Sequence, residues 1–126
     1  MAVAYVDTSC LVAIAFQERG TSALRRRLER FEDLISSNLL EAELLAAFRR
    51  EEIEQYPALL RAISWVIPDR PLSAEITRVL ETGYVRGADC WHLAAALYVA
   101  ADPRALSFLT LDEQQEGIAT RLGFET

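Results

Sequence analysis

Two short apolar runs near opposite ends of the chain each lead into an aspartate. The first begins at Val3 and is followed by Asp7, and the last begins at Leu106 and is followed by Asp112. Their β-branched and aromatic residues are typical of buried strands. In open α/β sheets, the carboxyl ends of such strands lie where ligands bind. Two carboxylates at one sheet edge therefore indicate a metal site.

The hydrophobic period between these runs switches repeatedly between strand and helix spacing, which predicts a three-layer α/β/α sandwich with a mostly parallel central sheet. Ser9, Thr21 and Ser73 are the predicted N-caps of three helices. Further strands are expected at 33–37 and 64–67, and further helical segments at 39–52, 57–62, 88–101 and before the C-capping Gly123. The 88–101 helix is apolar on nearly every side, so it should be buried against the sheet.

The length of 126 residues predicts a single domain spanning 1–126, and the 52% hydrophobic content is enough to build a core. No positively charged N-terminal region is present, and no apolar stretch approaches the ~20 residues of a membrane span. We therefore expect a cytoplasmic protein without membrane association. Cys10 and Cys90 match no metal-ligand spacing, which argues against a zinc site or a disulfide framework.

The net charge of -6 argues against a protein that coats nucleic acid, but acids gathered in one cleft leave an RNA substrate open. All 13 basic residues are arginine, the side chain best suited to bidentate phosphate contacts, although codon bias explains this usage as well. Trp65 and Trp91 offer base stacking, but aromatics in apolar segments are more often core residues. The arginines considered for RNA contacts, most of which a solvated helix face also explains, are Arg19, Arg25, Arg49 and Arg86.

Each candidate acid has an ordinary structural explanation on its own. Asp7 can cap a turn, Asp89 can cap a helix, and Asp112 stands at a capping-box spacing from the glutamine three residues later. Glu43 lies within a predicted helix beside apolar residues, where a carboxylate is partly desolvated at some cost. Glu41 points about 160° away from it and also has apolar neighbours. Periodicity therefore leaves open which of the two glutamates faces inward.

Taken together, the acids follow an order along the chain: after a strand, within a helix, at a helix start and after a strand. A parallel α/β layout brings all four toward one sheet edge. Two carboxylates ~4 Å apart repel by about 4 kcal/mol at an effective dielectric near 20, so such a cluster requires a bound cation. Oxygen ligands without cysteine or several histidines select Mg²⁺ or Mn²⁺. These ions also bind phosphate oxygens.

The order and surroundings of the acids resemble the PIN domain, and most closely the VapC ribonuclease toxins, over essentially the whole chain. The motifs that carry the resemblance are VDTS at 6–9, SNLLEAEL at 37–44, GADCWHLAAA at 87–96 and LTLD at 109–112. In the second motif the glutamate before the leucine is the acidic ligand, which favours Glu43 over Glu41. In the third, an aspartate precedes a histidine by three residues, as Asp89 precedes His92.

The resemblance implies a metal-dependent endoribonuclease in which Asp7, Glu43, Asp89 and Asp112 hold one or two Mg²⁺ or Mn²⁺ ions. Such ions polarise the scissile phosphate and generate a hydroxide nucleophile. The resemblance also implies cleavage of structured RNA such as tRNA or rRNA, inhibition of translation, a homodimer, and a cognate VapB-type antitoxin.

Four further side chains are expected near these ligands. Thr8, Ser9 and Thr110 can hydrogen-bond the ligand carboxylates, since such carboxylates are usually oriented by neighbouring groups, although turn capping explains them equally well. His92 lies one turn after Asp89 and can reach into the site. We expect it to support the fold or the ligands rather than to bind the ion.

Two other classes of protein share parts of this pattern. A phosphoacceptor receiver domain has similar length and an acidic pocket, but it needs paired acids after the first strand and a lysine near the last. Here Asp7 has no acidic neighbour and the chain has no lysine. A catalytically silent PIN-like module that binds RNA or protein usually lacks a ligand acid, whereas all four are present. RNA turnover distinguishes the enzyme from the binding module.

Overall fold

The computed structural model describes residues 2–55 and 57–126, and over these residues the centre of the fold is a four-stranded, all-parallel sheet. Its strands are β1 (Val3–Val6), β2 (Asp33–Ser37), β3 (Ile63–Val66) and β4 (Ser107–Leu109), in the order β3-β2-β1-β4. β2 and β4 pair with opposite sides of β1, as in Tyr5↔Ile35 and Tyr5↔Phe108. The strand order thus switches direction at β1, and α/β proteins bind ligands at the carboxyl ends of strands at such a point.

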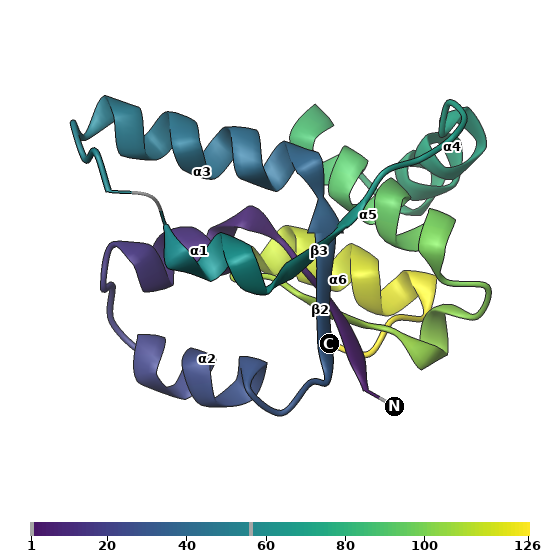
Figure 1. The fold of residues 1–126 in the computed structure, drawn as a ribbon. Coiled ribbons are helices and arrows are strands. Elements are labelled where there is room, and N and C mark those ends of the chain that lie inside the picture. Colours follow the sequence, from purple (N-terminus) through teal and green to yellow (C-terminus); the bar gives the residue numbers. More distant parts are fainter. Residues whose placement is uncertain (1, 56) are drawn as a thin grey trace.

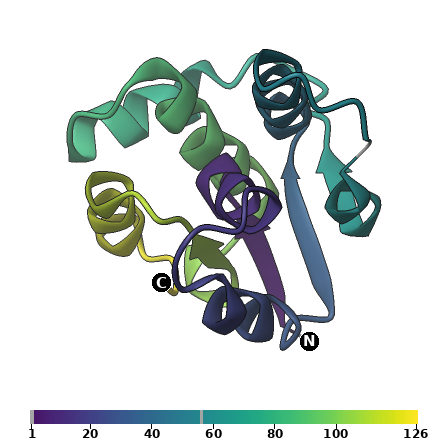
Figure 2. The ribbon, with the colours of Figure 1, turned by 90° about the vertical axis from the view of Figure 1, so that its left-hand side faces the viewer.

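Helices cover both faces of this sheet, so the predicted α/β/α sandwich is confirmed (Figures 1 and 2). The helices of one face are α1 (Thr8–Ala15), α2 (Thr21–Leu28), α3 (Asn38–Arg50) and the 3₁₀ helix η1 (Ala58–Ala62). The helices of the other face are α4 (Ser73–Thr82), α5 (Gly87–Val99) and α6 (Glu113–Leu122), and the 3₁₀ turn η2 (Pro103–Ala105) precedes β4. Among the described residues, no helix combines the length and apolar character that crossing a membrane requires.

The side chains of β1 pack into two separate cores, because successive side chains of a strand point to opposite faces of the sheet. Tyr5 belongs to the core under α4, α5 and α6, where its ring stacks on Phe108 at a centroid distance of 5.3 Å. Ala4 and Val6 belong to the core under α1 and α3. The run of α5 from 93 to 96 is fully buried, which confirms that this helix packs against the sheet.

Several helix starts differ from the predicted caps. Asp7, not Ser9, is the N-cap of α1 and accepts the backbone N–H of Ser9. Thr21 and Ser73 are the first residues of α2 and α4, and neither helix has a side-chain N-cap bond. Asp89 lies inside the first turn of α5 and does not cap it. Caps depend on local φ and ψ, which residue type alone does not determine.

The end of the chain folds back onto β4. Gly123 adopts the left-handed conformation with φ 106°, ends α6 as predicted and reverses the chain. The N–H of Phe108 then donates to the carbonyl of Glu125 at 2.8 Å. β4 itself ends at Leu109, earlier than the apolar run suggested, because the residues up to Asp112 form the turn into α6.

Candidate functional site

The parallel strands bring the four predicted acids toward the carboxyl edge of the sheet. Asp7 directly follows β1, and Glu43 lies in the second turn of α3, which begins where β2 ends. Asp89 lies in the first turn of α5, and Asp112 follows β4 by three residues. The charges of Asp7 and Asp112 both act on Asp89. The expected convergence of elements at this edge is therefore present.

Asp7 is buried, and one of its two carboxylate oxygens is held by hydroxyl groups. Oδ2 accepts the hydroxyl of Ser9 at 2.7 Å and lies 3.1 Å from Oγ1 of Thr110. The other oxygen, Oδ1, lies 3.8 Å from Nε2 of His92. Ser9 and Thr110 thus contact this acid as the sequence suggested, and Asp7 also caps α1.

A buried hydrogen-bonded chain connects β1 to Glu43 through His92, which is 1% exposed. Its Nδ1 lies 2.7 Å from the Tyr5 hydroxyl, and its Nε2 lies 2.9 Å from Oε1 of Glu43. The Tyr5 oxygen accepts the backbone N–H of Ser37 at 3.0 Å, so its own proton is free for Nδ1. With Nδ1 accepting from Tyr5, Nε2 carries a proton and donates to Oε1 of Glu43.

Glu43 faces this network and Glu41 does not. The hydroxyl of Thr8 donates to the same Glu43 oxygen at 2.7 Å. The hydrogen bond from His92 holds the pKa of Glu43 below its usual value, although partial burial acts in the opposite direction. Glu41 instead accepts from the side-chain amide of Asn38 at an exposed position. Helix periodicity left open which of the two glutamates faces inward, and these contacts show that Glu43 does.

Asp89 is the acid whose ionisation is disfavoured. Burial, and then the negative charge of Asp7, raise the pKa of its carboxyl above the usual value. Nε of Arg86 lies 3.8 Å from Oδ2 of Asp89 and opposes this shift. The guanidinium is 78% exposed, so it only partly offsets the negative potential of the edge. Such a potential favours a bound cation.

Asp112 makes the capping contact that its sequence spacing indicated. Its Oδ1 accepts the backbone N–H of Gln115 at 2.8 Å and caps α6. The Gln115 side chain is fully buried, lies 2.7 Å from the Thr110 hydroxyl through Oε1, and donates through Nε2 to the carbonyl of Asp89. Gln115 thereby ties α6 to the start of α5.

Two members of this network were missed by sequence reasoning. Tyr5 was read only as an apolar strand residue, and Gln115 only as a capping partner. Neither residue type nor spacing signals a bond between a strand tyrosine and a histidine 87 positions away. The network is complete: over the described residues, every buried side-chain nitrogen and oxygen has a hydrogen-bond partner.

The side chains of residues 2–55 and 57–126 do not form a preformed metal-binding site. Among them, no three His, Cys, Asp or Glu residues are grouped so that they could hold a metal ion. Asp112 caps a helix, Glu43 is bonded to His92, and Asp89 lies beside Arg86. The donor set nevertheless suits a hard divalent cation, because it offers carboxylate oxygens in a negative environment.

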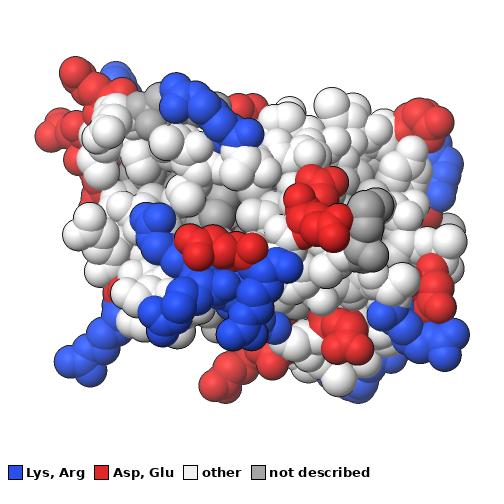
Figure 3. All heavy atoms as spheres, turned by 60° about the horizontal axis from the view of Figure 1, so that its bottom comes forward, with Lys and Arg blue, Asp and Glu red and all other residues white. Residues whose placement is uncertain are grey.

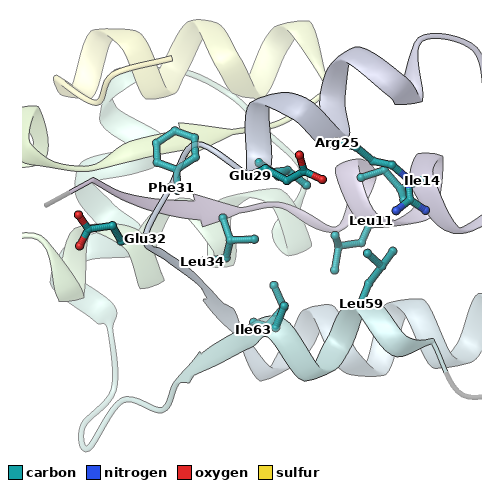
Figure 4. A pocket seen from close by; sticks show the side chains of 11 residues that line it. Leu11, Ile14, Arg25, Glu29, Phe31, Glu32, Leu34, Leu59 and Ile63 are labelled. Atoms are coloured by element: carbon teal, nitrogen blue, oxygen red, sulfur yellow. The ribbon is translucent and has the colours of Figure 1, made fainter.

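One group of basic side chains, which includes Arg25, Arg26 and Arg27 of α2, lies away from the acidic edge. α2 leads toward the amino ends of the strands, and Figure 3 shows blue side chains grouped on the face of the molecule that includes this helix. A pocket of ≈ 290 Å³ lies next to α2, where Leu11, Leu34 and Ile63 meet Arg25 and Glu29 (Figure 4). None of the four candidate acids lines this pocket.

Comparison with known proteins gives one result. The family model described as PIN domain matches residues 4–120, which is most of the chain. No curated protein and no solved structure matches the chain significantly.

Proposed function

Because this chain belongs to the PIN domain family, we propose that it is a metal-dependent endoribonuclease of the VapC type. PIN domains are generally metal-dependent nucleases. The observation that carries the proposal is the position of the four acids at the carboxyl edge of the sheet, by the strand switch point, where the half-buried Asp89 carboxyl is under the influence of the charges of Asp7 and Asp112. A carboxyl whose ionisation is disfavoured by partial burial and by neighbouring acids is typical of a functional site.

The residues proposed to hold Mg²⁺ or Mn²⁺ are Asp7, Glu43, Asp89 and Asp112. An ion bound by them would activate water and neutralise the charge that develops on the scissile phosphate. Their carboxylate oxygens match the preference of both ions, and Cys90, the nearest sulfur ligand in sequence, is buried in the core.

The surrounding side chains orient these acids. Ser9 and Thr110 fix one oxygen of Asp7, while His92 and Thr8 fix one oxygen of Glu43. The remaining carboxylate oxygens are the ones available to a cation. Because the Glu43 pKa is held below its usual value, this acid is ionised at neutral pH and needs no proton loss to bind.

The finer parts of the proposal rest on the motif resemblance. The substrate is structured RNA such as tRNA or rRNA, and its cleavage in the cytoplasm inhibits translation. The protein acts as a homodimer and is neutralised by a cognate VapB-type antitoxin. A carboxylate-rich edge is a suitable receptor for an antitoxin arginine, since guanidinium and carboxylate groups form strong charge-assisted hydrogen bonds.

A PIN-like module that binds RNA or protein without cleavage is the second candidate. It is favoured by Asp112, whose carboxylate is used to cap α6, and by the absence of a preformed metal-ligand group among the described residues. Such a module would retain RNA or partner binding after chelation of divalent ions.

The deciding experiment is incubation of total RNA with the purified protein in Mg²⁺, in Mn²⁺ and in EDTA, beside the Asp89→Asn variant. The proposal predicts cuts in both metals, none in EDTA and none with the variant. Mapping of the new ends identifies the target RNA. Intact RNA with folded, antitoxin-free wild-type protein would favour the binding module instead.

A further inference from the structure

A second, mainly apolar pocket lies beside the amino end of α5, next to the proposed acidic edge. It measures ≈ 420 Å³ and is formed by α4, the loop at 83–86 and the first turns of α5. The side chains of Leu80, Tyr84 and Trp91 line it. Tyr84 is 70% exposed and Leu80, which lines the same pocket, is 48% exposed. The volume lies in the range of small-molecule sites.

The loop that carries Tyr84 is anchored to α6. Gln114 donates through Nε2 to the carbonyl of Tyr84 at 2.6 Å, and Arg121 donates through Nη1 to the carbonyl of Thr82 at 3.1 Å. Gly83 lies so close to Ile118 that an added Cβ would come within 3.3 Å of it. The Tyr84 ring is therefore presented by a fixed backbone, which lowers the entropic cost of stacking on a ligand.

The two ends of this surface differ in charge. Arg86 follows Tyr84 by two residues and carries an exposed guanidinium, whose Nε lies 3.8 Å from the carboxylate of Asp89. One end of the loop thus offers an aromatic ring over an apolar pocket, and the other offers a cation beside a candidate catalytic acid. A nucleotide has the complementary pair of groups, a flat base and a phosphate.

We propose that this pocket and Arg86 bind one unpaired nucleotide of a single-stranded RNA segment, with its base against Tyr84 and its phosphate at Arg86. The inference rests on the proposed ribonuclease function and adds a substrate-binding site to it. Duplex RNA cannot enter, because its bases are stacked and paired. The site therefore directs cleavage to loops and single-stranded ends.

The binding test uses a fluorescein-labelled single-stranded RNA octamer and anisotropy in EDTA, where no cleavage occurs. Tyr84→Ala should weaken binding ~10-fold, because stacking on the ring is lost, whereas Tyr84→Phe should bind like the wild type. Arg86→Gln should reduce the slope of log affinity against log salt by ~0.7, as expected when one phosphate contact is lost. Arg78→Gln removes the same charge from α4 outside the pocket lining and should change neither quantity.

An occluding variant tests the pocket without removing a contact. A Cβ at Gly87 would meet no atom within 4 Å, so Gly87→Leu should place its side chain in the open space of the pocket. It should weaken octamer binding without lowering Tm, since glycine is a poor helix former. Wild-type affinity in Tyr84→Ala, Arg86→Gln and Gly87→Leu would overturn the inference.

A second copy of this chain is the other candidate occupant, and light scattering of the same variants detects it. A dimer lost in Tyr84→Ala with unchanged RNA binding would overturn the nucleotide site. The experiments distinguish failure of the nucleotide site from failure of the proposed ribonuclease function. Octamer binding with the predicted variant pattern but no RNA cleavage would remove the ribonuclease and keep this site, whereas cleavage with unchanged KM in Tyr84→Ala would do the reverse.

Discussion

At the scale of single residues, His92 shows how a buried side chain serves both the sheet and the candidate site. It accepts from Tyr5 on β1 and donates to Glu43 on α3, and both ring nitrogens are used. A buried group that loses such a partner keeps its desolvation cost without the compensating bond. Removal of His92 should therefore affect stability and the orientation of Glu43 together.

His92→Ala should lower the free energy of unfolding by about 2–4 kcal/mol, because it leaves a cavity and removes one hydrogen-bond partner from Tyr5 and one from Glu43. Tyr5→Phe removes one hydroxyl and should cost about 1–2 kcal/mol. Urea unfolding followed by circular dichroism measures both. Equal stability of His92→Ala and the wild type would show that the network does not form in solution.

Glu43→Gln should abolish RNA cleavage, whereas Glu41→Gln should leave it within about twofold of the wild type. Both variants lose one negative charge from the same helix, but only Glu43 is bonded to His92 and Thr8. Initial cleavage rates under identical Mg²⁺ concentrations provide the measurement. The reverse pattern would place Glu41 in the site.

Asp89→Asn should raise Tm at pH 7 in EDTA, by ~2 °C, which corresponds to less than about 1 kcal/mol for a domain of this size. Because the folded pKa of Asp89 is raised, the protonated carboxyl is the form that stabilises the fold, and stability falls as pH rises through that pKa. The amide mimics the protonated form. The gain should therefore shrink as pH falls toward the ordinary value of 3.8. A variant less stable than wild type at pH 7 would contradict the charge repulsion.

At the scale of elements, two helices begin at acids that are also candidate ligands. Asp7 caps α1 and Asp112 caps α6, so each carboxylate both satisfies backbone N–H groups and lies at the sheet edge. The sequence predicted the Asp112 cap from its spacing to Gln115, but it assigned the cap of α1 to Ser9. The spacing to Gln115 correctly predicted the Asp112 cap, although the Gln115 side chain bonds Thr110 and Asp89 and does not return a bond to the Asp112 N–H. At α1, where several polar residues adjoin, residue type did not identify the capping residue.

Asp112 allows the capping role to be separated from the proposed ligand role. Asp112→Asn retains an oxygen acceptor for the Gln115 N–H and should change the free energy of unfolding by less than about 0.5 kcal/mol, yet lose activity. Asp112→Ala should lose activity and also about 1 kcal/mol of stability. Parallel unfolding and cleavage assays test the pair. Full activity of Asp112→Asn would restrict this residue to capping.

At the scale of the whole molecule, the layers and the order of acids were predictable, because strand and helix periods alternate clearly and parallel strands end at one edge. The contacts within the site could not be predicted from the sequence. The bonds from His92 to Tyr5 and Glu43 join residues far apart in sequence and depend on ring orientation, and the Arg86 to Asp89 contact depends on a loop conformation. The sequence also suggested a four-carboxylate cluster, whereas the described side chains engage those acids in local bonds.

The most direct test of the account is therefore Mn²⁺ binding, measured by electron paramagnetic resonance on the wild type, Asp7→Asn, Asp89→Asn and the control Glu41→Gln. If the carboxylates at the sheet edge form a metal centre, the wild type and Glu41→Gln bind Mn²⁺ with equal affinity, and the two aspartate variants bind it at least about tenfold more weakly. Absence of Mn²⁺ binding by the wild type, or equal binding by all four proteins, would contradict the metal centre on which the proposed ribonuclease depends.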